Sequence, residues 1–225
     1  MKPEKPGTGS PELDALLGGG LERRVITQIY GEPASGKSTL CLMAAVECLK
    51  AGKSVVFIDT EGFSVDRFSQ IAGEQAEELA EHLYLFEPVD FEQQGLMIAE
   101  SEGLLRAGRE YPVDLIVMDS ATALYRTEFE AGKEAVRKLS HYMVKLLGLA
   151  KKYDVPVLIT NQIYMDIDRS RVMGLGGTAL AHISKAIVRL EKTDSVRRAV
   201  LQKHRWRPEG LSFEFVLTED GIKGV

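Results

Sequence analysis

The sequence predicts an α/β protein whose central sheet is mostly parallel and has helices on both faces. Segments rich in apolar and β-branched residues alternate with segments of helical pattern over most of the 225 residues, which is typical of parallel sheets. In the last third, β-type segments follow one another across short turns, which predicts an antiparallel extension. Because no repeat, low-complexity tract or linker interrupts the chain, we expect one domain over residues 1–225.

The elements can be placed in order from local signals. A short helix begins after Ser10, an N-cap residue followed by proline, and ends at the glycines 18–20. The strands expected in the parallel part are residues 25–30, 54–59, 83–86, 115–119 and 157–160. The helices expected between them are residues 37–50, 66–81, 91–107 and 133–153. The strands expected in the extension are residues 185–191, 196–203 and 211–217.

Composition sets limits on function. With 44% hydrophobic residues the chain can bury a full core, yet no apolar run reaches the ~20 residues of a membrane span and no signal peptide opens it. We therefore expect a cytoplasmic protein that does not bind membranes. The two cysteines, Cys41 and Cys48, are seven residues apart on one expected helix, too far for a disulfide, so buried free thiols are expected.

Charge is distributed unevenly along the chain. The net charge of −5 does not indicate a nucleic-acid binder as a whole. Residues 59–102 carry twelve acids and a single cation, Arg67, whereas residues 166–207 are mainly basic. The basic part is a candidate for contact with a polyanion, although charge runs are more often solvated faces.

A glycine-rich segment between the first strand and its helix is the most specific feature. It fits G-x-x-x-x-G-K-[ST], the phosphate-binding loop of NTPases, and it lies between a β-type run and a helical run, as that motif requires. Lys37 supplies a charge to the β- and γ-phosphates of ATP, Ser38 a hydroxyl to Mg²⁺, and the helix N-terminus its dipole. The residues expected to bind the cofactor are Gly31, Glu32, Pro33, Ala34, Ser35, Gly36, Lys37, Ser38 and Thr39.

Polar residues at the ends of other strands complete an expected ATP site. Asp119 ends a buried strand and is the second expected ligand of Mg²⁺, with Ser38. Glu61 follows the second strand and is our candidate for polarising the attacking water, whereas Asp59 is expected to be structural. Gln162 ends the fifth strand, where an amide could sense the γ-phosphate; the alternative is a Thr-Asn-Gln turn with local caps.

Two long segments follow the fourth and fifth strands. Residues 121–133 and 163–178 show no clear period, and the second contains several glycines and a basic middle. Long irregular loops in compact domains are usually functional or disordered. Because the two strands should be neighbours, we expect these loops to lie side by side.

Taken together, the motifs resemble those of the RecA-type recombinases, within the archaeal RadA/RadB branch. The phosphate loop is followed in order by Asp-Thr-Glu-Gly at 59–62, Leu-Ile-Val-Met-Asp-Ser at 115–120, Thr-Asn-Gln at 160–162 and Gly-Gly-x-x-Leu-Ala-His at 176–182. The match covers nearly the whole chain, including the lead-in at residues 13–20. The resemblance implies a RecA-like P-loop NTPase fold with the fifth strand between the first and fourth, which would put Gln162 between Lys37 and Asp119.

The resemblance also implies roles for several arginines. Arg126, in the first loop, and Arg169 and Arg171, in the second, would contact the DNA backbone, and Arg67 would lie near the adenine. The basic cluster Lys203, Arg205, Trp206 and Arg207 allows three interpretations. It could bind single-stranded DNA through charge and stacking, it could resemble the Lys-x-Arg fingers that reach a neighbouring subunit's γ-phosphate, or it could be a solvated hairpin end.

Departures from the full recombinases narrow the expected function. Only about thirty residues precede the phosphate loop, so the helical DNA-binding domain is expected to be absent; so is the Phe-x-x-Ala segment that docks one subunit on the next. The first loop looks shorter, and Thr178 stands where the full recombinases carry histidine. These features resemble the short members of the branch and imply an accessory factor rather than an autonomous strand-exchange enzyme.

The main hypothesis is therefore a DNA-binding protein, with slow ATP hydrolysis, that assists homologous recombination and DNA repair. Its expected partners are DNA, preferentially single-stranded, a recombinase or junction-processing protein, and further copies of itself. One alternative is an adaptor switched by nucleotide that regulates a recombinase or junction nuclease. The other is a ring-forming RecA-like signalling ATPase.

Overall fold

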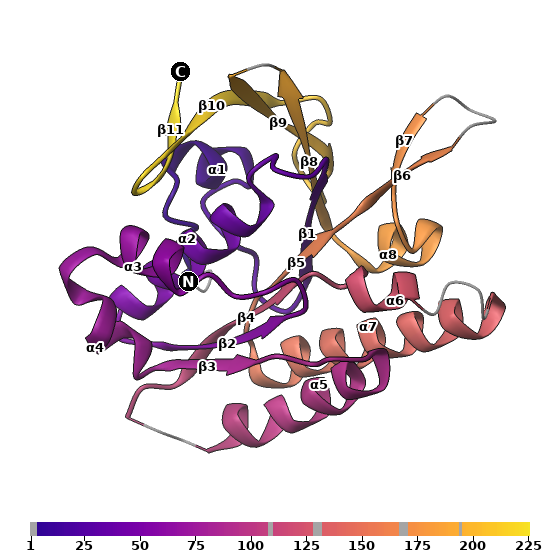
Figure 1. The fold of residues 1–225 in the computed structure, drawn as a ribbon, viewed down its shortest axis with the longest axis horizontal. Helices are drawn as coiled ribbons and strands as arrows, with labels where there is room; N and C mark the ends of the chain where they lie inside the picture. The colour runs from indigo at the N-terminus through magenta and orange to yellow at the C-terminus, as the bar shows by residue number, and fades with distance from the viewer. Residues whose placement is uncertain (1–3, 108–109, 128–131, 167–170, 194) are drawn as a thin grey trace.

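The computed structural model describes residues 4–107, 110–127, 132–166, 171–193 and 195–225. Within them, nine strands form one twisted sheet in the order β11-β10-β9-β8-β1-β5-β4-β2-β3 (Figure 1). The strands of this sheet are β1 (Ile26–Gly31), β2 (Ser54–Asp59), β3 (Leu83–Phe86), β4 (Val113–Asp119), β5 (Val157–Asn161), β8 (Ala186–Thr193), β9 (Val196–Lys203), β10 (Ser212–Thr218) and β11 (Gly221–Gly224).

The remaining elements are helices and one hairpin. The helices are α1 (Pro11–Leu16), α2 (Lys37–Lys50), α3 (Val65–Ala72), a 3₁₀ turn η1 (Gly73–Gln75), α4 (Ala76–Ala80), α5 (Phe91–Arg106), α6 (Ala123–Thr127), α7 (Lys133–Tyr153) and α8 (Gly177–Ile183). Strands β6 (Ile163–Asp166) and β7 (Arg171–Gly174) pair with each other and project from the body of the molecule in Figure 1.

The expected architecture is confirmed. Strands β3, β2, β4, β5, β1 and β8 run parallel, and β9, β10 and β11 extend the sheet antiparallel. Strand β5 lies between β1 and β4, as the resemblance implied. Ser10 caps α1, because its Oγ accepts a hydrogen bond from the Leu13 amide at 3.2 Å.

The two faces of the sheet are covered by different helices. One apolar core joins α1, α2 and α3 to the sheet and includes the fully buried Leu40 and Phe57. The other joins α5 and α7 to the opposite face and includes Ile116 and Leu139. Both faces are therefore buried, which explains why the central strands read as almost continuous apolar runs. Cys41 and Cys48 are buried free thiols, as predicted.

Two expectations about local structure were wrong, and one strand was not predicted. The expected helix 66–81 is broken at Gly73, whose φ of +69° ends α3. The expected irregular segments contain α6 after β4, and the β6–β7 hairpin and α8 after β5. The short edge strand β11 was not expected, because four residues that begin and end with glycine carry too weak a pattern.

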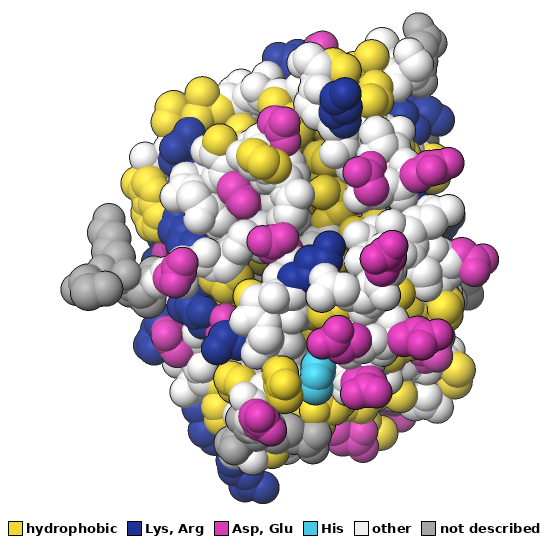
Figure 2. Space-filling view, turned by 90° about the vertical axis from the view of Figure 1, so that its left-hand side faces the viewer, with side chains coloured by type: hydrophobic (Ala, Val, Ile, Leu, Met, Phe, Trp, Pro, Cys, Tyr) yellow, Lys and Arg dark blue, Asp and Glu magenta, His cyan; other side chains and the backbone are white. Residues whose placement is uncertain are grey.

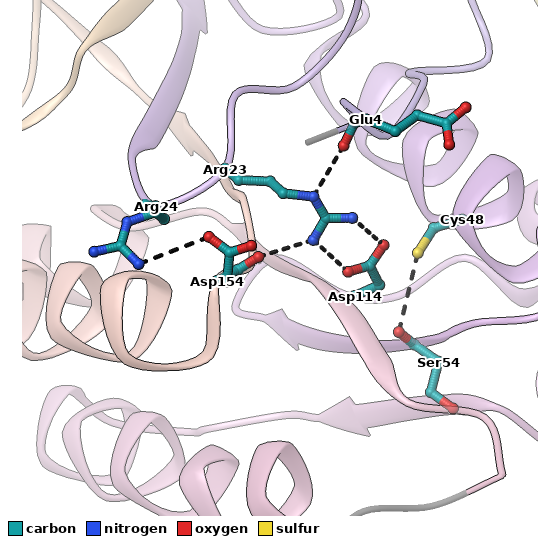
Figure 3. Close-up of polar contacts among 7 residues, drawn as sticks. All are labelled: Glu4, Arg23, Arg24, Cys48, Ser54, Asp114 and Asp154. Carbon is teal, nitrogen blue, oxygen red and sulfur yellow. Dashed lines mark hydrogen bonds and ion pairs between the residues drawn. The ribbon is translucent and has the colours of Figure 1, made fainter. Parts of the chain in front are cut away.

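At the amino edge of the parallel strands, a polar network ties distant parts of the chain together (Figure 3). Arg23 donates two hydrogen bonds to the Asp114 carboxylate, at 2.6 and 2.7 Å, and others to the Glu4 and Asp154 carbonyl oxygens. Next to it, Arg24 pairs with the Asp154 carboxylate at 3.7 Å. The network joins the N-terminal segment to the start of β4 and the end of α7.

Exposed acidic residues of the acidic segment 59–102 lie on one face of the molecule. Figure 2 shows acidic side chains gathered on the face of the molecule that carries α3 and α4, where Glu74, Glu77, Glu78 and Glu81 are exposed. Among the described residues, no helix is both long and apolar enough to cross a bilayer.

Candidate nucleotide-binding site

The phosphate loop connects the end of β1 to the start of α2 and has the backbone that its glycines permit. Gly36 has φ of +104°, and Ala34 also has a positive φ, of +59°. A Cβ on Gly31 would lie 2.5 Å from the Leu190 carbonyl oxygen, so this position accepts no side chain. The loop turns back on itself in front of the N-terminus of α2, where backbone amides and the helix dipole favour an anion.

Two side chains of this loop, Lys37 and Ser35, can make hydrogen bonds beyond those that they form in the structure. The Lys37 ammonium donates to the Gly31 and Glu32 carbonyl oxygens at 3.0 and 2.9 Å. Burial lowers the pKa of Lys37, opposed in part by the nearby Glu61 and Asp119 carboxylates. Ser35 is fully buried, and its hydroxyl oxygen has no hydrogen-bond partner among the described residues. A buried donor without a partner costs about 1–3 kcal/mol, and a phosphate oxygen would remove that cost, so the loop fits the predicted triphosphate.

Asp119 lies where the predicted metal ligand should be. The side chain is buried at the end of β4, and Thr160 Oγ1 donates a hydrogen bond to its Oδ1. Burial raises the pKa of Asp119, while hydrogen bonds with Thr160 and Ser38 lower it. The two predicted Mg²⁺ ligands, Ser38 and Asp119, are thus in direct contact, and hydroxyl and carboxylate oxygens suit a hard divalent cation.

Glu61 and Gln162 also meet at this edge, although 101 positions separate them. Gln162 Nε2 donates to Glu61 Oε1 at 2.9 Å, while the Gln162 Oε1 is buried without a partner among the described residues. Asp59 Oδ2 accepts a 2.6 Å hydrogen bond from the Gly62 amide and thereby holds the turn that carries Glu61. Burial raises the pKa of Asp59 to about 6.

A cavity of about 90 Å³ is lined by Ser38, Asp59, Glu61, Arg67 and Asp119, among others. The Arg67 guanidinium donates to the Thr218, Glu219 and Gly221 carbonyl oxygens and so fixes the turn between β10 and β11 next to α3. Arg67 is therefore held at the rim of the site. Its expected position near the adenine stays a prediction.

The segments after β4 and β5 begin side by side, and the expectation for the rest of the two loops stays a prediction. Thr122 Oγ1 donates to Asn161 Oδ1 at 2.8 Å and accepts from the Gln162 amide at 3.1 Å. Asn161 Nδ2 donates to the Leu175 carbonyl oxygen at 2.8 Å, and the Leu175 amide donates to the Gln162 carbonyl oxygen at 2.7 Å. Gln162 is thus bonded directly to the base of the β6–β7 hairpin.

The residues predicted to contact DNA are not all described. Arg126 is exposed at the end of α6. Arg169 lies outside the described residues, and Arg171 belongs to β7 by its backbone while its side chain is outside the description.

The cluster Lys203, Arg205, Trp206 and Arg207 lies at the opposite edge of the sheet from the phosphate loop. Strand β8 runs parallel to β1, and β9 returns antiparallel, so that Lys203 pairs with Ile187 near the start of β8. Lys203 donates to the Ala181 carbonyl oxygen at 2.6 Å, and Arg205 pairs with Glu22 at 3.1 Å. These cations lie too far from this chain's phosphate loop to reach a triphosphate bound there. The neighbouring-subunit, DNA and solvated-hairpin interpretations all stay open.

Comparisons with known proteins agree with this geometry. The family model described as Rad51 matches residues 5–225. The chain belongs to the Rad51 family. Its curated relatives include the "DNA repair and recombination protein RadB" of Methanoculleus marisnigri, which is 74% identical over the whole length of both chains. The protein of the same name from Methanococcoides burtonii is 48% identical, with 94% of each chain covered.

A solved structure extends the agreement to three dimensions. The structure titled "Crystal structure of the RadB recombinase" is 39% identical, covers 98% of this chain and 99% of its own, and has a TM-score of 0.83. The RecA-like fold predicted from the motifs, and the resemblance to the short RadB members of the Rad51 family, are therefore confirmed.

Several residues that contact the nucleotide site of this Rad51-family protein were not predicted from the sequence. Thr160 and Asn161 belong to the Thr-Asn-Gln motif, yet only Gln162 was singled out; the uninterrupted run of polar residues after an apolar strand was the available signal. Arg197 in β9 donates to the Ala34 carbonyl oxygen of the phosphate loop at 3.5 Å. No sequence signal separates Arg197 from its neighbour Arg198, which instead bonds Ser212.

Proposed function

We propose that the chain binds ATP with Mg²⁺ at the carboxyl edge of the parallel strands, binds DNA through the neighbouring loops, and assists homologous recombination and DNA repair. The observation that carries the proposal is the convergence of Lys37, Ser38, Asp119, Glu61 and Gln162 at one edge, with Glu61 and Gln162 in direct hydrogen bond. Membership of the Rad51 family and the names of the RadB relatives support the role in recombination and repair.

In this proposal each residue has a defined part in ATP binding. The loop amides and the α2 N-terminus hold the phosphates, and Lys37 exchanges the Gly31 and Glu32 carbonyl oxygens for β- and γ-phosphate oxygens. Ser38 and Asp119 would hold Mg²⁺, which when bound neutralises charge on the phosphates. In the chain alone, burial lowers the pKa of Lys37. Contacts with the negatively charged oxygens of ATP would offset this effect of burial on the ammonium group.

Glu61 orients the water that attacks the γ-phosphate, and Gln162 reports whether that phosphate is present. In the structure, Glu61 is already engaged by the Gln162 amide. A carboxylate held by an amide is less free to orient a water molecule, so we expect slow hydrolysis until Gln162 turns toward the phosphate. Because the Gln162 backbone carbonyl accepts a hydrogen bond from the Leu175 amide, a turn of the side chain that also moved this backbone would be passed to the hairpin and from there to bound DNA.

DNA binding would use the loop segments rather than the whole surface, since the chain is acidic overall. Arg126 on α6 and the basic residues of the hairpin segment are the candidates. The binding constant should fall with added salt, because phosphate contacts release counterions.

The proposal is tested by measuring ATP turnover with and without single-stranded DNA, together with titration calorimetry of Mg²⁺-ATP and the size of the protein in solution. We expect heat of binding, slow turnover and salt-sensitive retention of DNA on filters. Folded protein that releases no heat with Mg²⁺-ATP would refute the nucleotide site, and DNA retention that does not change with salt would refute the DNA site.

A further inference from the structure

A groove lies between α5 and α7, away from the sheet edge that carries the phosphate loop. The two helices lie side by side in Figure 1, and the cavity between their outer surfaces has a volume of about 580 Å³. Its lining includes Gly95, Leu96 and Ala99 from α5 and His141, Tyr142 and Lys145 from α7. A volume of this size suits a few large side chains.

The floor of the groove is apolar and well packed. The Tyr142 ring lies over Gly95 so closely that a Cβ there would overlap the ring, and it also packs edge-on against Phe91 with ring centres 4.9 Å apart. Within the lining, Leu96 is a large apolar residue that is 62% exposed. A large apolar side chain exposed in a formed cavity can be buried by a bound partner.

A stripe of basic residues runs along one side of this groove. Arg137, His141 and Lys145 are exposed and spaced four residues apart on α7, so they lie on one helix face. Neither Arg137 nor Lys145 has an ion pair with a described residue. By contrast, Lys138 and Lys152 on the same helix are paired with Glu92 and Glu102 of α5, at 3.3 and 2.6 Å.

We propose that the α5–α7 groove docks an acidic segment of a partner protein, which places apolar side chains against Leu96 and Tyr142 and carboxylates against Arg137 and Lys145. Charge complementarity selects an acidic partner, since Arg137 and Lys145, which have no ion pair with a described residue, attract and orient an acidic segment locally. The apolar floor favours protein over DNA, because a sugar-phosphate backbone has no large apolar group to bury beside Leu96 and Tyr142. An amphipathic helix in a groove is a common way for such a segment to bind.

The test uses fluorescence anisotropy with the complete chain and a labelled synthetic helical peptide. The probe carries leucines at i, i+3, i+4 and i+7 with flanking glutamates, and a second peptide replaces the glutamates by lysines. We expect the acidic peptide to bind, Leu96→Asp to weaken its binding about tenfold or more, and Arg137→Glu with Lys145→Glu to weaken it similarly. The lysine peptide should bind far less tightly to the unaltered chain and gain affinity for the charge-reversed one.

Two matched variants control for folding and general charge effects. Val65→Asp alters another apolar residue, 66% exposed, on α3, and Lys50→Glu reverses an exposed charge at the end of α2; both should change peptide affinity less than twofold. Equal binding of the acidic and lysine peptides, or no effect of Leu96→Asp, would overturn the proposal. So would protection of Lys145 from chemical labelling by single-stranded DNA, or a change of oligomeric state caused by Leu96→Asp, which would assign the groove to DNA or to a second copy.

Discussion

The two edges of the parallel sheet hold their charged residues in different states. At the carboxyl edge, burial lowers the pKa of Lys37 and raises those of Asp59 and Asp119, and the Ser35 hydroxyl has no partner among the described residues. At the amino edge, Arg23, Arg24 and Arg205 are each paired with a carboxylate. At the carboxyl edge, buried charged groups destabilise the chain, and a bound ligand can remove part of that cost. At the amino edge, the ion pairs stabilise the fold by joining distant segments.

The largest expected effect is at the carboxyl edge. Lys37→Ala should lower the affinity for ATP at least about a hundredfold, because the loop loses its charge against the phosphates. Titration calorimetry measures this directly. The control is Lys50→Ala, at the exposed end of the same helix. Equal ATP affinity for the Lys37 variant and the unaltered chain would contradict the assignment.

Glu61→Gln separates binding from chemistry at the same edge. Turnover should fall about 10²–10⁴-fold, the usual contribution of general acid–base catalysis, while ATP affinity changes little because Glu61 does not bind the phosphates. Phosphate release and calorimetry together measure the two quantities. Glu74→Gln, on the exposed acidic face, should alter neither. Unchanged turnover in the Glu61 variant would move the catalytic role elsewhere.

At the amino edge, Arg23→Ala should lower the free energy of unfolding by about 2–3 kcal/mol and leave ATP affinity unchanged. The substitution leaves the Asp114 carboxylate, 18% exposed, without its bidentate partner. Urea denaturation measures the change. Arg205→Ala breaks a pair whose arginine is 47% exposed, and it should cost less than about 1 kcal/mol. Adding Asp114→Asn to the Arg23 variant should recover part of the loss; a further loss would show that the pair is not the cause.

The smallest effect concerns Asp59. Because the folded chain holds its proton more tightly than the unfolded chain does, the folded state loses stability as pH rises from about 4 to about 6. Asp59→Asn should remove this loss, on the order of 1–2 kcal/mol across that window. Denaturation at several pH values in a metal chelator measures it. A parallel pH dependence in both chains would mean that Asp59 does not titrate in this range.

Much of the carboxyl edge could be predicted from the sequence because its signals are local. The strand, loop and helix around residues 26–50 require particular residues at fixed spacing, and helices 37–50 and 133–153 begin and end where their patterns do. The place of Gln162 between Lys37 and Asp119 followed only once the resemblance gave the strand order, and its hydrogen bond with Glu61 was not predicted.

The rest depended on contacts between distant residues. Arg23 meets Asp114 and Asp154, which are 91 and 131 positions away, and nothing near either partner marks the pairing. The groove between α5 and α7 likewise forms only when β2, β3, β4 and β5 place the two helices next to each other. The hairpin β6–β7 was missed because its two short strands show no alternation of apolar and polar residues.

One consequence follows from the way the hairpin is rooted. Asn161 Nδ2 bonds the Leu175 carbonyl oxygen and would lie only 2.6 Å from a Cβ on Gly174, so the root has no free space. Strand β6, with four residues, extends about 13 Å from that root. Because this root is tightly packed, the hairpin would move as one unit. A rotation of about 10° where Gln162 joins it would displace the far end of β6 by roughly 2 Å. That distance is sufficient to make or break a hydrogen bond with a DNA strand bound as we propose.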